Sequence, residues 1–251
     1  GRIAGVFTEK GYLRTGAVIL AGGAWSSMFL RRHGIDLPQC SVHSTVFATT
    51  PAAQVTPGGL NTPDFILTPL LDGGYLVAAK ARARLELTPA GIRHARKFWP
   101  TLARSWKVLD LRLGRSFLEG PDALHGAWSF AKPTVFERIR VLDPKPNTAI
   151  VEPALREIVA AYPELAGIRM ARAWAGWIDS TPDAVPVISP VGSLPGLTIA
   201  TGFSGHGFGI GPGMGRVVAD LVAGHDPGHD LRRFRLSRFT DGSPLIPGPS
   251  L

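Results

Sequence analysis

The sequence has few of the residues that build covalent or metal-bound frameworks. Its 251 residues include a single cysteine, Cys40, which excludes a disulfide scaffold and a cysteine-rich metal site. No apolar run reaches the roughly 18 residues that a membrane-spanning helix needs. No signal-peptide pattern precedes the first methionine, Met28. We therefore expect a cytoplasmic protein with no transmembrane segment and no metal site.

Charge of one sign is not gathered on any single segment. Lys and Arg number 27 against 19 Asp and Glu, which gives a formal net charge of +8. The basic residues form short clusters at 31–33, 93–97 and 232–238, mostly at helical spacings typical of solvated faces. A nucleic-acid binder usually concentrates its basic residues on one element and interleaves aromatics. We expect no nucleic-acid partner, while the positive charge favours anionic substrates or cofactors.

Glycine and proline, in contrast, are abundant, at 30 and 22 residues. One glycine pair, Gly22-Gly23, follows the apolar run 17–21, which predicts a strand buried on both faces of a parallel sheet. A short helix is predicted over 25–30. A buried strand that leads through glycines into a helix N-terminus commonly holds phosphate or ribose, although many other α/β turns also contain glycine.

A denser glycine segment follows the predicted strand 197–201. Residues 202–215 contain seven glycines and lead into an amphipathic helix predicted over 216–223. So many glycines disfavour folding, and they are useful where backbone amides must approach a ligand closely. The alternative is a flexible loop, but the regularly spaced Phe203, Phe208 and Ile210 are not typical of flexible linkers.

The middle of the chain has a different character from both ends. Glu9-Lys10-Gly11 predicts one hairpin turn near the start, and Asp72-Gly73-Gly74 predicts another within a set of antiparallel strands. The strands predicted here cover 42–50, 65–71, 75–79, 135–142 and 168–178. The predicted helices cover 89–107, with a break or kink near Pro100, and 152–162. The predicted fold class is therefore α/β at the ends and α+β in the middle.

Three motifs together resemble the D-amino-acid-oxidase-like family of FAD-dependent oxidoreductases. The first is Val18-Ile-Leu-Ala-Gly-Gly-Ala-Trp-Ser26, which resembles the family's strand beside the adenosine and pyrophosphate of FAD. The second, within 174–188, resembles its Thr-Pro-Asp-x-x-Pro signature, and the third, within 200–210, resembles its flavin-contacting loop. They occur in the family's order and bracket almost the whole chain.

The resemblance implies a doubly wound FAD-binding domain interrupted by a substrate domain with an antiparallel sheet. The FAD-binding portions would be 1–40 and 173–251, and the substrate domain 41–172. The family's Gly-x-Gly-x-x-Gly unit after a first strand is not found near the start of the chain. The chain thus resembles the C-terminal part of a longer flavoprotein, and we expect a missing N-terminal half or a partner subunit.

The resemblance also implies a reaction and a cofactor site. The substrate would be a small amine or amino acid, of the D-amino-acid, N-substituted amino-acid or opine type, and hydride would pass to the flavin. Some relatives attach the flavin to a cysteine where this chain has Gly176, so we expect noncovalent FAD. The implied cofactor-binding residues are Gly22, Gly23, Trp25, Gly202, Phe203, Ser204, Gly205, His206, Gly207, Phe208, Gly209 and Ile210.

Catalytic residues are less well indicated. The candidates are His206, Tyr75 and Trp177, each of which has packing or hydrogen bonding as its alternative role. Ile178 stands where amino-acid-oxidising members carry an arginine for the substrate carboxylate, and Gly209 stands where some oxidases carry a lysine. Both an oxidase and a dehydrogenase therefore remain open.

A different partner for a substrate carboxylate must be sought. The candidates are Tyr75, Lys80, Arg82, Arg84 and His43. For Trp174 we favour packing, and for Asp183 a role in the turn that follows Pro182. The alternative to an enzyme is a noncatalytic chain that keeps the fold but cannot hold FAD alone.

Overall fold

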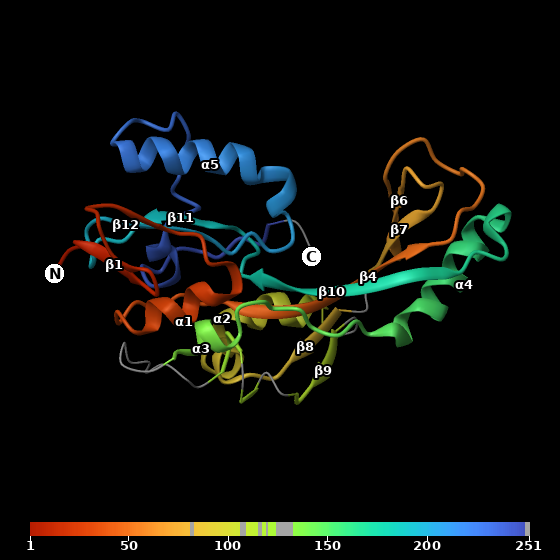
Figure 1. Cartoon of the computed structure of the whole chain (residues 1–251), viewed down its shortest axis with the longest axis horizontal. Helices are drawn as coiled ribbons and strands as arrows, with labels where there is room; N and C mark the ends of the chain where they lie inside the picture. Colours follow the sequence, from red (N-terminus) through yellow and green to blue (C-terminus); the bar gives the residue numbers. More distant parts are fainter. Residues whose placement is uncertain (81–82, 106–108, 115–116, 119, 124–132, 249–251) are drawn as a thin grey trace.

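The structure is a computed structural model that describes residues 1–80, 83–105, 109–114, 117–118, 120–123 and 133–248. Figure 1 shows an elongated molecule with helix α5 (Gly207–Ala223) and a small sheet at one end. Strands β6 (Phe65–Pro69) and β7 (Tyr75–Ala79) stand at the other end. The long strands β4 (Cys40–Thr49) and β10 (Met170–Ser180) run between the two ends.

The small sheet is built from both ends of the chain. Its order is β11 (Val187–Pro190), β12 (Leu197–Thr201) and β3 (Val18–Leu20), with β12 parallel to β3 and antiparallel to β11. The prediction that 17–21 is buried on both faces is wrong, since the Ile19 side chain is 47% exposed. The reason is that β3 is the edge strand of this sheet, with one strand neighbour among the described residues.

The large sheet confirms the predicted antiparallel strands of the middle region. Its order is β5 (Leu60–Asn61), β6, β7, β4, β8 (Ala83–Glu86) and β9 (Leu109–Arg112), and β10 also pairs with β4. All its pairings are antiparallel except β8 with β9. A separate hairpin of β1 (Gly5–Thr8) and β2 (Gly11–Arg14) confirms the turn predicted at residues 9–11.

The helices agree with the sequence in part. They are α1 (Ser26–Arg31), preceded by the 3-10 helix η1 (Gly23–Trp25), α2 (Pro89–Ser105), α3 (Val135–Arg138), α4 (Val151–Ala161) and α5, with further 3-10 helices η3 (Thr148–Ile150), η4 (Pro163–Leu165) and η5 (Leu236–Phe239). Helix α2 continues through Pro100, and the end predicted at residue 107 lies outside the described residues. None of the described helices is long and apolar enough to cross a membrane.

Two predictions about helices are wrong. The strand predicted over 135–142 begins as helix α3, because Thr134 and Glu137 form a capping box that starts a helix there. The helix predicted over 216–223 begins nine residues earlier, at Gly207, so the last five glycines of the dense segment are helical. Met214, Val217 and Val218 pack against β11 in a buried cluster, and this packing outweighs the low helix propensity of glycine.

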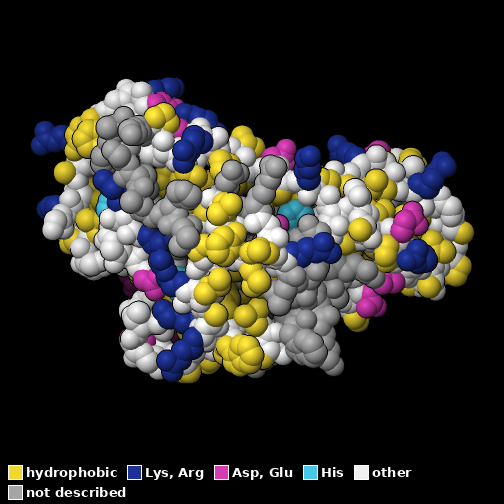
Figure 2. All heavy atoms as spheres, turned by 90° about the horizontal axis from the view of Figure 1, so that it is seen from below, with side chains coloured by type: hydrophobic (Ala, Val, Ile, Leu, Met, Phe, Trp, Pro, Cys, Tyr) yellow, Lys and Arg dark blue, Asp and Glu magenta, His cyan; other side chains and the backbone are white. Residues whose placement is uncertain are grey.

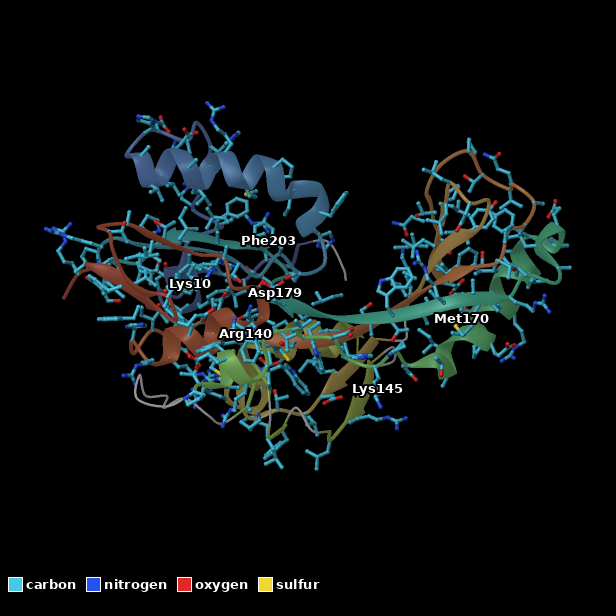
Figure 3. The ribbon with its side chains drawn as sticks, viewed as in Figure 1. Lys10, Arg140, Lys145, Met170, Asp179 and Phe203 are labelled. Atoms are coloured by element: carbon cyan, nitrogen blue, oxygen red, sulfur yellow. The ribbon has the colours of Figure 1, made fainter. Side chains whose placement is uncertain are left out.

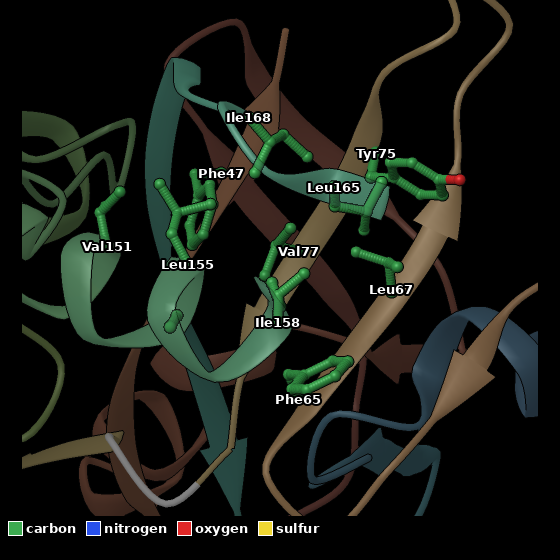
Figure 4. Close-up of a cluster of buried hydrophobic side chains, with 11 residues drawn as sticks. Phe47, Phe65, Leu67, Tyr75, Val77, Val151, Leu155, Ile158, Leu165 and Ile168 are labelled. Carbon is green, nitrogen blue, oxygen red and sulfur yellow. The ribbon is translucent and has the colours of Figure 1, made fainter. Parts of the chain in front are cut away.

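The largest apolar core lies between the large sheet and α4. In Figure 4, side chains of β4, β6 and β7 face side chains of α4 and the segment after it. Phe47 of β4 is completely buried there, as are Val77 and Ile158. A second core joins α1 to the small sheet through Leu30, Val187 and Ile199 among others.

The outer surface carries its positive charge in a dispersed form. Figure 2 shows Lys and Arg side chains scattered among apolar ones over the face seen from below. Several of the basic side chains are paired on the surface, such as Arg140 with Glu9 and Arg232 with Asp230.

Candidate functional site

The two glycine segments singled out in the sequence meet in space. Because β3 and β12 are parallel, their carboxyl ends lie at the same edge of the small sheet. The Ser26 hydroxyl, just after the first segment, donates a hydrogen bond to Thr201 Oγ1 over 3.0 Å. Thr201 Oγ1 lies 3.2 Å from the carbonyl oxygen of Gly23. The implied cofactor-binding stretches 22–25 and 202–210 therefore form one continuous edge.

The second segment has left-handed backbone at Gly202, Ser204 and Gly205, and at Gly202 there is no room for a side chain. Gly202 has φ of +73°, and a Cβ added there would lie 2.4 Å from Thr181 Cγ2. Gly205 has φ of +81°, and the fully buried Ser204 has φ of +50°. A positive φ at a serine costs free energy and persists when surrounding contacts fix it. Here the Ser204 amide donates to the Asp179 carbonyl at 3.1 Å, and its hydroxyl to the Gly202 carbonyl at 3.1 Å.

Helix α5 begins directly after these turns. The carbonyl oxygen of His206 accepts hydrogen bonds from the amides of Gly209 and Ile210, both at 3.2 Å. Gly207 lies against Phe203, whose Cβ would be 3.3 Å from an added Cβ, while Phe208 is fully exposed. At Gly209, Gly211, Gly213 and Gly215 an added Cβ would meet nothing within 4 Å. The open helix surface and the positive end of the helix dipole suit a negatively charged group.

A carboxylate, Asp179, lies at the junction of these segments. Its Oδ2 accepts hydrogen bonds from the Gly202 amide at 2.7 Å and the Thr201 hydroxyl at 3.1 Å. Figure 3 shows Asp179 near Phe203, with Met170 at the far end of the same strand. Burial raises the pKa of Asp179, and the hydrogen bonds that it accepts offset this only in part. Asp179 is not among the predicted site residues, because its contacts to Gly202 and Gln39 lie far away in the sequence.

The large sheet presents one covered face beside this edge. Phe47, Thr45 and His43 alternate along β4 on that face, and all three are buried. The Asn147 amide donates to Thr45 Oγ1 at 2.9 Å, and His43 Nε2 lies 3.0 Å from the Lys145 carbonyl. The candidate His43 is therefore a packed, hydrogen-bonded residue rather than a partner for a substrate carboxylate.

Trp177 also lies on the covered face. It pairs with His43 in the register of β10 and β4, and its ring stands edge-on to the imidazole at 5.3 Å between centroids. This contact gives Trp177 a packing partner, and its choice as a catalytic candidate stays a prediction. The sequence does not tell which face of the strand Trp177 occupies, because the two faces of a strand alternate.

The other face of the large sheet is partly exposed at Ser44 and Val46 of β4, although Val42 on the same face is buried. Trp174, Gly176 and Ile178 alternate along β10 on this face, opposite Val46, Ser44 and Val42 of β4. The Trp174 side chain is 39% exposed, with the Arg172 guanidinium 5.3 Å from its ring centroid. Trp174, which the sequence analysis assigned to packing, is thus the tryptophan on the accessible face.

Tyr75 is not available as a catalytic group. Its side chain is buried in the core beneath β7. Its hydroxyl donates to the Ala53 carbonyl and accepts from the Val55 amide, both at 2.8 Å. Tyr75 is therefore part of the core between the large sheet and α4, which disagrees with the prediction that it contacts a substrate.

The structure describes fewer contacts for the remaining candidates for a partner of the substrate carboxylate. Lys80 hydrogen bonds to Asn61 at the surface. Arg82 lies outside the described residues, and Arg84 is described only through its backbone pairing with His43. In the described part of the chain, no group of three His, Cys, Asp or Glu side chains is arranged to hold a metal ion.

Asp183 has the structural role that the sequence predicts. Arg238 forms a bidentate ion pair with Asp183, in which Nε donates to Oδ2 at 2.9 Å and Nη2 donates to Oδ1 at 3.0 Å. Both side chains are 4% exposed. Arg238 also donates to the Val185 carbonyl at 2.7 Å. The Thr-Pro-Asp turn is therefore fixed by the C-terminal segment.

These features fit a dinucleotide cofactor that bears phosphate and a flavin. The backbone at Gly202 excludes side chains, the α5 glycines leave room for close approach, and the helix N-terminus faces the same edge. A ligand at the carboxyl ends of parallel strands is also the usual arrangement in α/β sheets.

Comparisons with known proteins agree with this geometry. Residues 1–221 match the family model described as FAD dependent oxidoreductase. A glycine oxidase from Pseudomonas aeruginosa is 25% identical over 226 residues, 90% of this chain and 47% of the relative. A D-amino acid dehydrogenase from Rhodopseudomonas palustris is 26% identical over 243 residues, 97% of this chain and 44% of the relative.

The fold of the chain also resembles that of a solved structure. The L-amino acid deaminase from Proteus myxofaciens, in complex with anthranilate, superposes with a TM-score of 0.86 at 28% identity. The match covers 96% of this chain and 53% of that protein. The chain spans about half the length of the relatives that it matches.

Proposed function

The chain belongs to the FAD-dependent oxidoreductase family, and from this premise we propose that it forms the flavin-edge and substrate-facing half of an enzyme that oxidises an amine or amino acid. The observation that carries the proposal is the meeting of the segments 22–25 and 202–210 at the carboxyl ends of two parallel strands. Relatives that act on amino acids, a glycine oxidase and a D-amino acid dehydrogenase, support the substrate class.

FAD, when bound, supplies the two-electron acceptor for a hydride from the carbon that bears the amine. The residues of this chain have the tasks of binding and orientation. Backbone amides around Gly205 and the first turn of α5 would hold a negatively charged edge of the cofactor. His206 directly precedes α5, and its imidazole is the side chain in this stretch that could accept a proton or donate a hydrogen bond.

The open face of the large sheet defines the proposed substrate side. Trp174, Ile178 and Val46 give it an apolar character, so it suits an apolar group on the substrate. A substrate carboxylate would need a cation from elsewhere, and Arg82 and Arg84 remain candidates. Gly176 lies on the same face, and its lack of a thiol supports noncovalent FAD.

Several finer points belong to the proposal. The FAD-binding portions would be 1–40 and 173–251, with 41–172 as the substrate domain, although β10 crosses that boundary as one continuous strand paired with β4. A missing N-terminal half or partner subunit would supply the rest of the cofactor site. A cytoplasmic location is a further prediction.

Flavin binding by variants of α5 tests the placement of the cofactor. Gly207→Val should abolish FAD binding by the whole protein that contains this chain, because a branched side chain would meet Phe203 and occupy the approach to the helix. Ala219→Val, on the exposed face of the same helix, is the matched control and should bind FAD normally. Full flavin occupancy in Gly207→Val would show that the cofactor is not held here.

The noncatalytic alternative rests on the half-length match to the relatives. It predicts that the chain alone is colourless and that no FAD titration shifts its spectrum. Visible flavin absorbance in the purified protein would dismiss it.

A further inference from the structure

One carboxylate oxygen of Asp179 receives donors from separate parts of the chain. The Gly202 amide and the Thr201 hydroxyl come from the end of β12, at 2.7 and 3.1 Å. Gln39 Nε2, which precedes β4, lies 3.4 Å away. Because Asp179 lies near the end of β10, this single oxygen connects the large sheet to the small one.

The same network reaches the first glycine segment. Gln39 Nε2 also donates to the Gly23 carbonyl at 2.9 Å, and Gln39 Oε1 accepts from the Ser27 amide at 2.9 Å. Ser26 donates to Thr201, which in turn faces both Gly23 and Asp179. Both stretches that the proposed function assigns to the cofactor are thus connected to Asp179. Gly202 is bonded to it directly, and Gly23 is connected to it through Gln39 or Thr201.

The donors around Asp179 Oδ2 explain why a hydrogen-bond acceptor is needed at this position. Removal of a buried acceptor leaves its donors unsatisfied, which costs more than the bond itself contributes. The Gly202 amide belongs to a residue with φ of +73°, and the next bond along, from the Ser204 amide to the Asp179 carbonyl, fixes a second positive φ. Such conformations persist only where several contacts enforce them.

We propose that Asp179 is the positioning residue that holds the Gly202–Ser204 backbone and the Gly23 turn in the shape that receives the cofactor. It acts through the amides and carbonyls of those residues and needs no contact with the reacting atoms. The part of this inference that concerns FAD rests on the proposed function, while the part that concerns the backbone does not.

Amide hydrogen exchange in the protein without added flavin tests the backbone part. Asp179→Ala should speed exchange at Gly202 by about tenfold or more, because the Gly202 amide loses its acceptor. Exchange at Ser204 should rise by a smaller factor, because its amide still donates to the main-chain carbonyl of residue 179. Asp179→Asn should stay within about threefold of wild type, since the amide oxygen still accepts from Gly202. Asp220→Ala, which breaks the Arg216 pair in the later part of α5, is the control and should leave both amides unchanged.

FAD titration of the same variants tests the cofactor part. Asp179→Ala should weaken FAD binding about tenfold or more, with rescue by Asp179→Asn. Unchanged exchange in Asp179→Ala, or equal loss in both Asp179 variants, would overturn the positioning role of the acceptor oxygen. If Asp179→Ala does not fold, Thr201→Val, which removes one donor to the same oxygen, should speed Gly202 exchange by a smaller factor, and no change would count against the inference. Failure of the wild-type protein to bind FAD would refute the proposed function, while the exchange comparison would still decide the role of Asp179.

Discussion

The two ends of strand β10 are held by opposite means. Toward its start, Ala173 lies against the apolar core of β4, β7 and α4, where Phe47 and Ile158 are fully buried. At its end, Asp179 joins the glycine segments through a network of hydrogen bonds. The difference indicates that the apolar end supplies stability and the polar end supplies a shaped site, where the backbone is held in unusual conformations by hydrogen bonds.

Truncation on the two faces of β4 tests the apolar end and has the largest expected effect. Phe47→Ala should lower the free energy of unfolding by about 3–5 kcal/mol, because it leaves a cavity between the sheet and α4. Val46→Ala, one residue away on the open face, is the matched control and should cost about 1 kcal/mol. Urea denaturation measures both, and equal losses would contradict the assignment of covered and open faces.

A side chain at Gly202 tests the polar end. Gly202→Ala should cost about 2–4 kcal/mol, since the positive φ and the overlap with Thr181 both oppose it. The opposite sign is expected for Gly213→Ala within α5, a gain of about 0.5–1 kcal/mol, because that position has open space and ordinary helical backbone. Thermal unfolding of the two variants distinguishes the required glycine from the merely tolerated one, and a tolerated alanine at 202 would contradict the described turn.

The pH dependence of stability probes a second buried carboxylate at this end of β4. Asp122 accepts from the Ser41 amide at 2.7 Å, and burial raises its pKa to about 6. A carboxyl in the unfolded chain has a pKa near 3.9, so the folded state binds the proton more tightly. The stabilisation that this provides is present in full below about pH 4 and is lost as the pH rises through about 6, up to about 3 kcal/mol.

Asp122→Asn isolates that contribution. The variant should lose the fall in unfolding free energy between about pH 4 and pH 6 that wild type shows, while other groups titrate equally in both proteins. Denaturant titrations at a series of pH values measure the difference. Parallel profiles for variant and wild type would mean that Asp122 ionises in the folded protein as easily as in the unfolded chain.

The two tryptophans of β10 give the smallest expected effects and separate function from packing. If the proposed function holds, Trp174→Ala should lower kcat/KM for an apolar substrate by about tenfold, because it removes an exposed side chain from the open face. Trp177→Ala should leave substrate binding nearly unchanged and lower stability instead, since its ring packs against His43. Steady-state kinetics and unfolding curves of both variants measure these effects. The reverse pattern would mean that Trp177, and not Trp174, lies on the substrate-facing side of the sheet.

Local patterns predicted much of the fold. Alternating apolar residues located β4, β6, β7 and β10, and the apolar spacing located α4 within one residue at each end. The start of α5 was missed because tertiary packing of Met214 and Val217 holds glycines in a helix that their own propensity disfavours.

The candidate site was predictable only where the signal was local. The glycine stretches 22–25 and 202–210 were found from the sequence, and the structure brings them together. The faces of Trp174 and Trp177 depend on which side α4 covers, and the hub at Asp179 depends on contacts 23 and 140 residues away, to Gly202 and Gln39. Neither is encoded in a local pattern.

The most direct test of the central claim is reduction of bound flavin by substrate. The protein would be loaded with FAD and mixed without oxygen with D- and L-amino acids, N-methyl amino acids and opines while its visible absorbance is followed. We predict that at least one of these amines bleaches the flavin, and that one with an apolar side group does so fastest. A protein that binds no FAD, or whose bound flavin none of these amines reduces, would contradict the account.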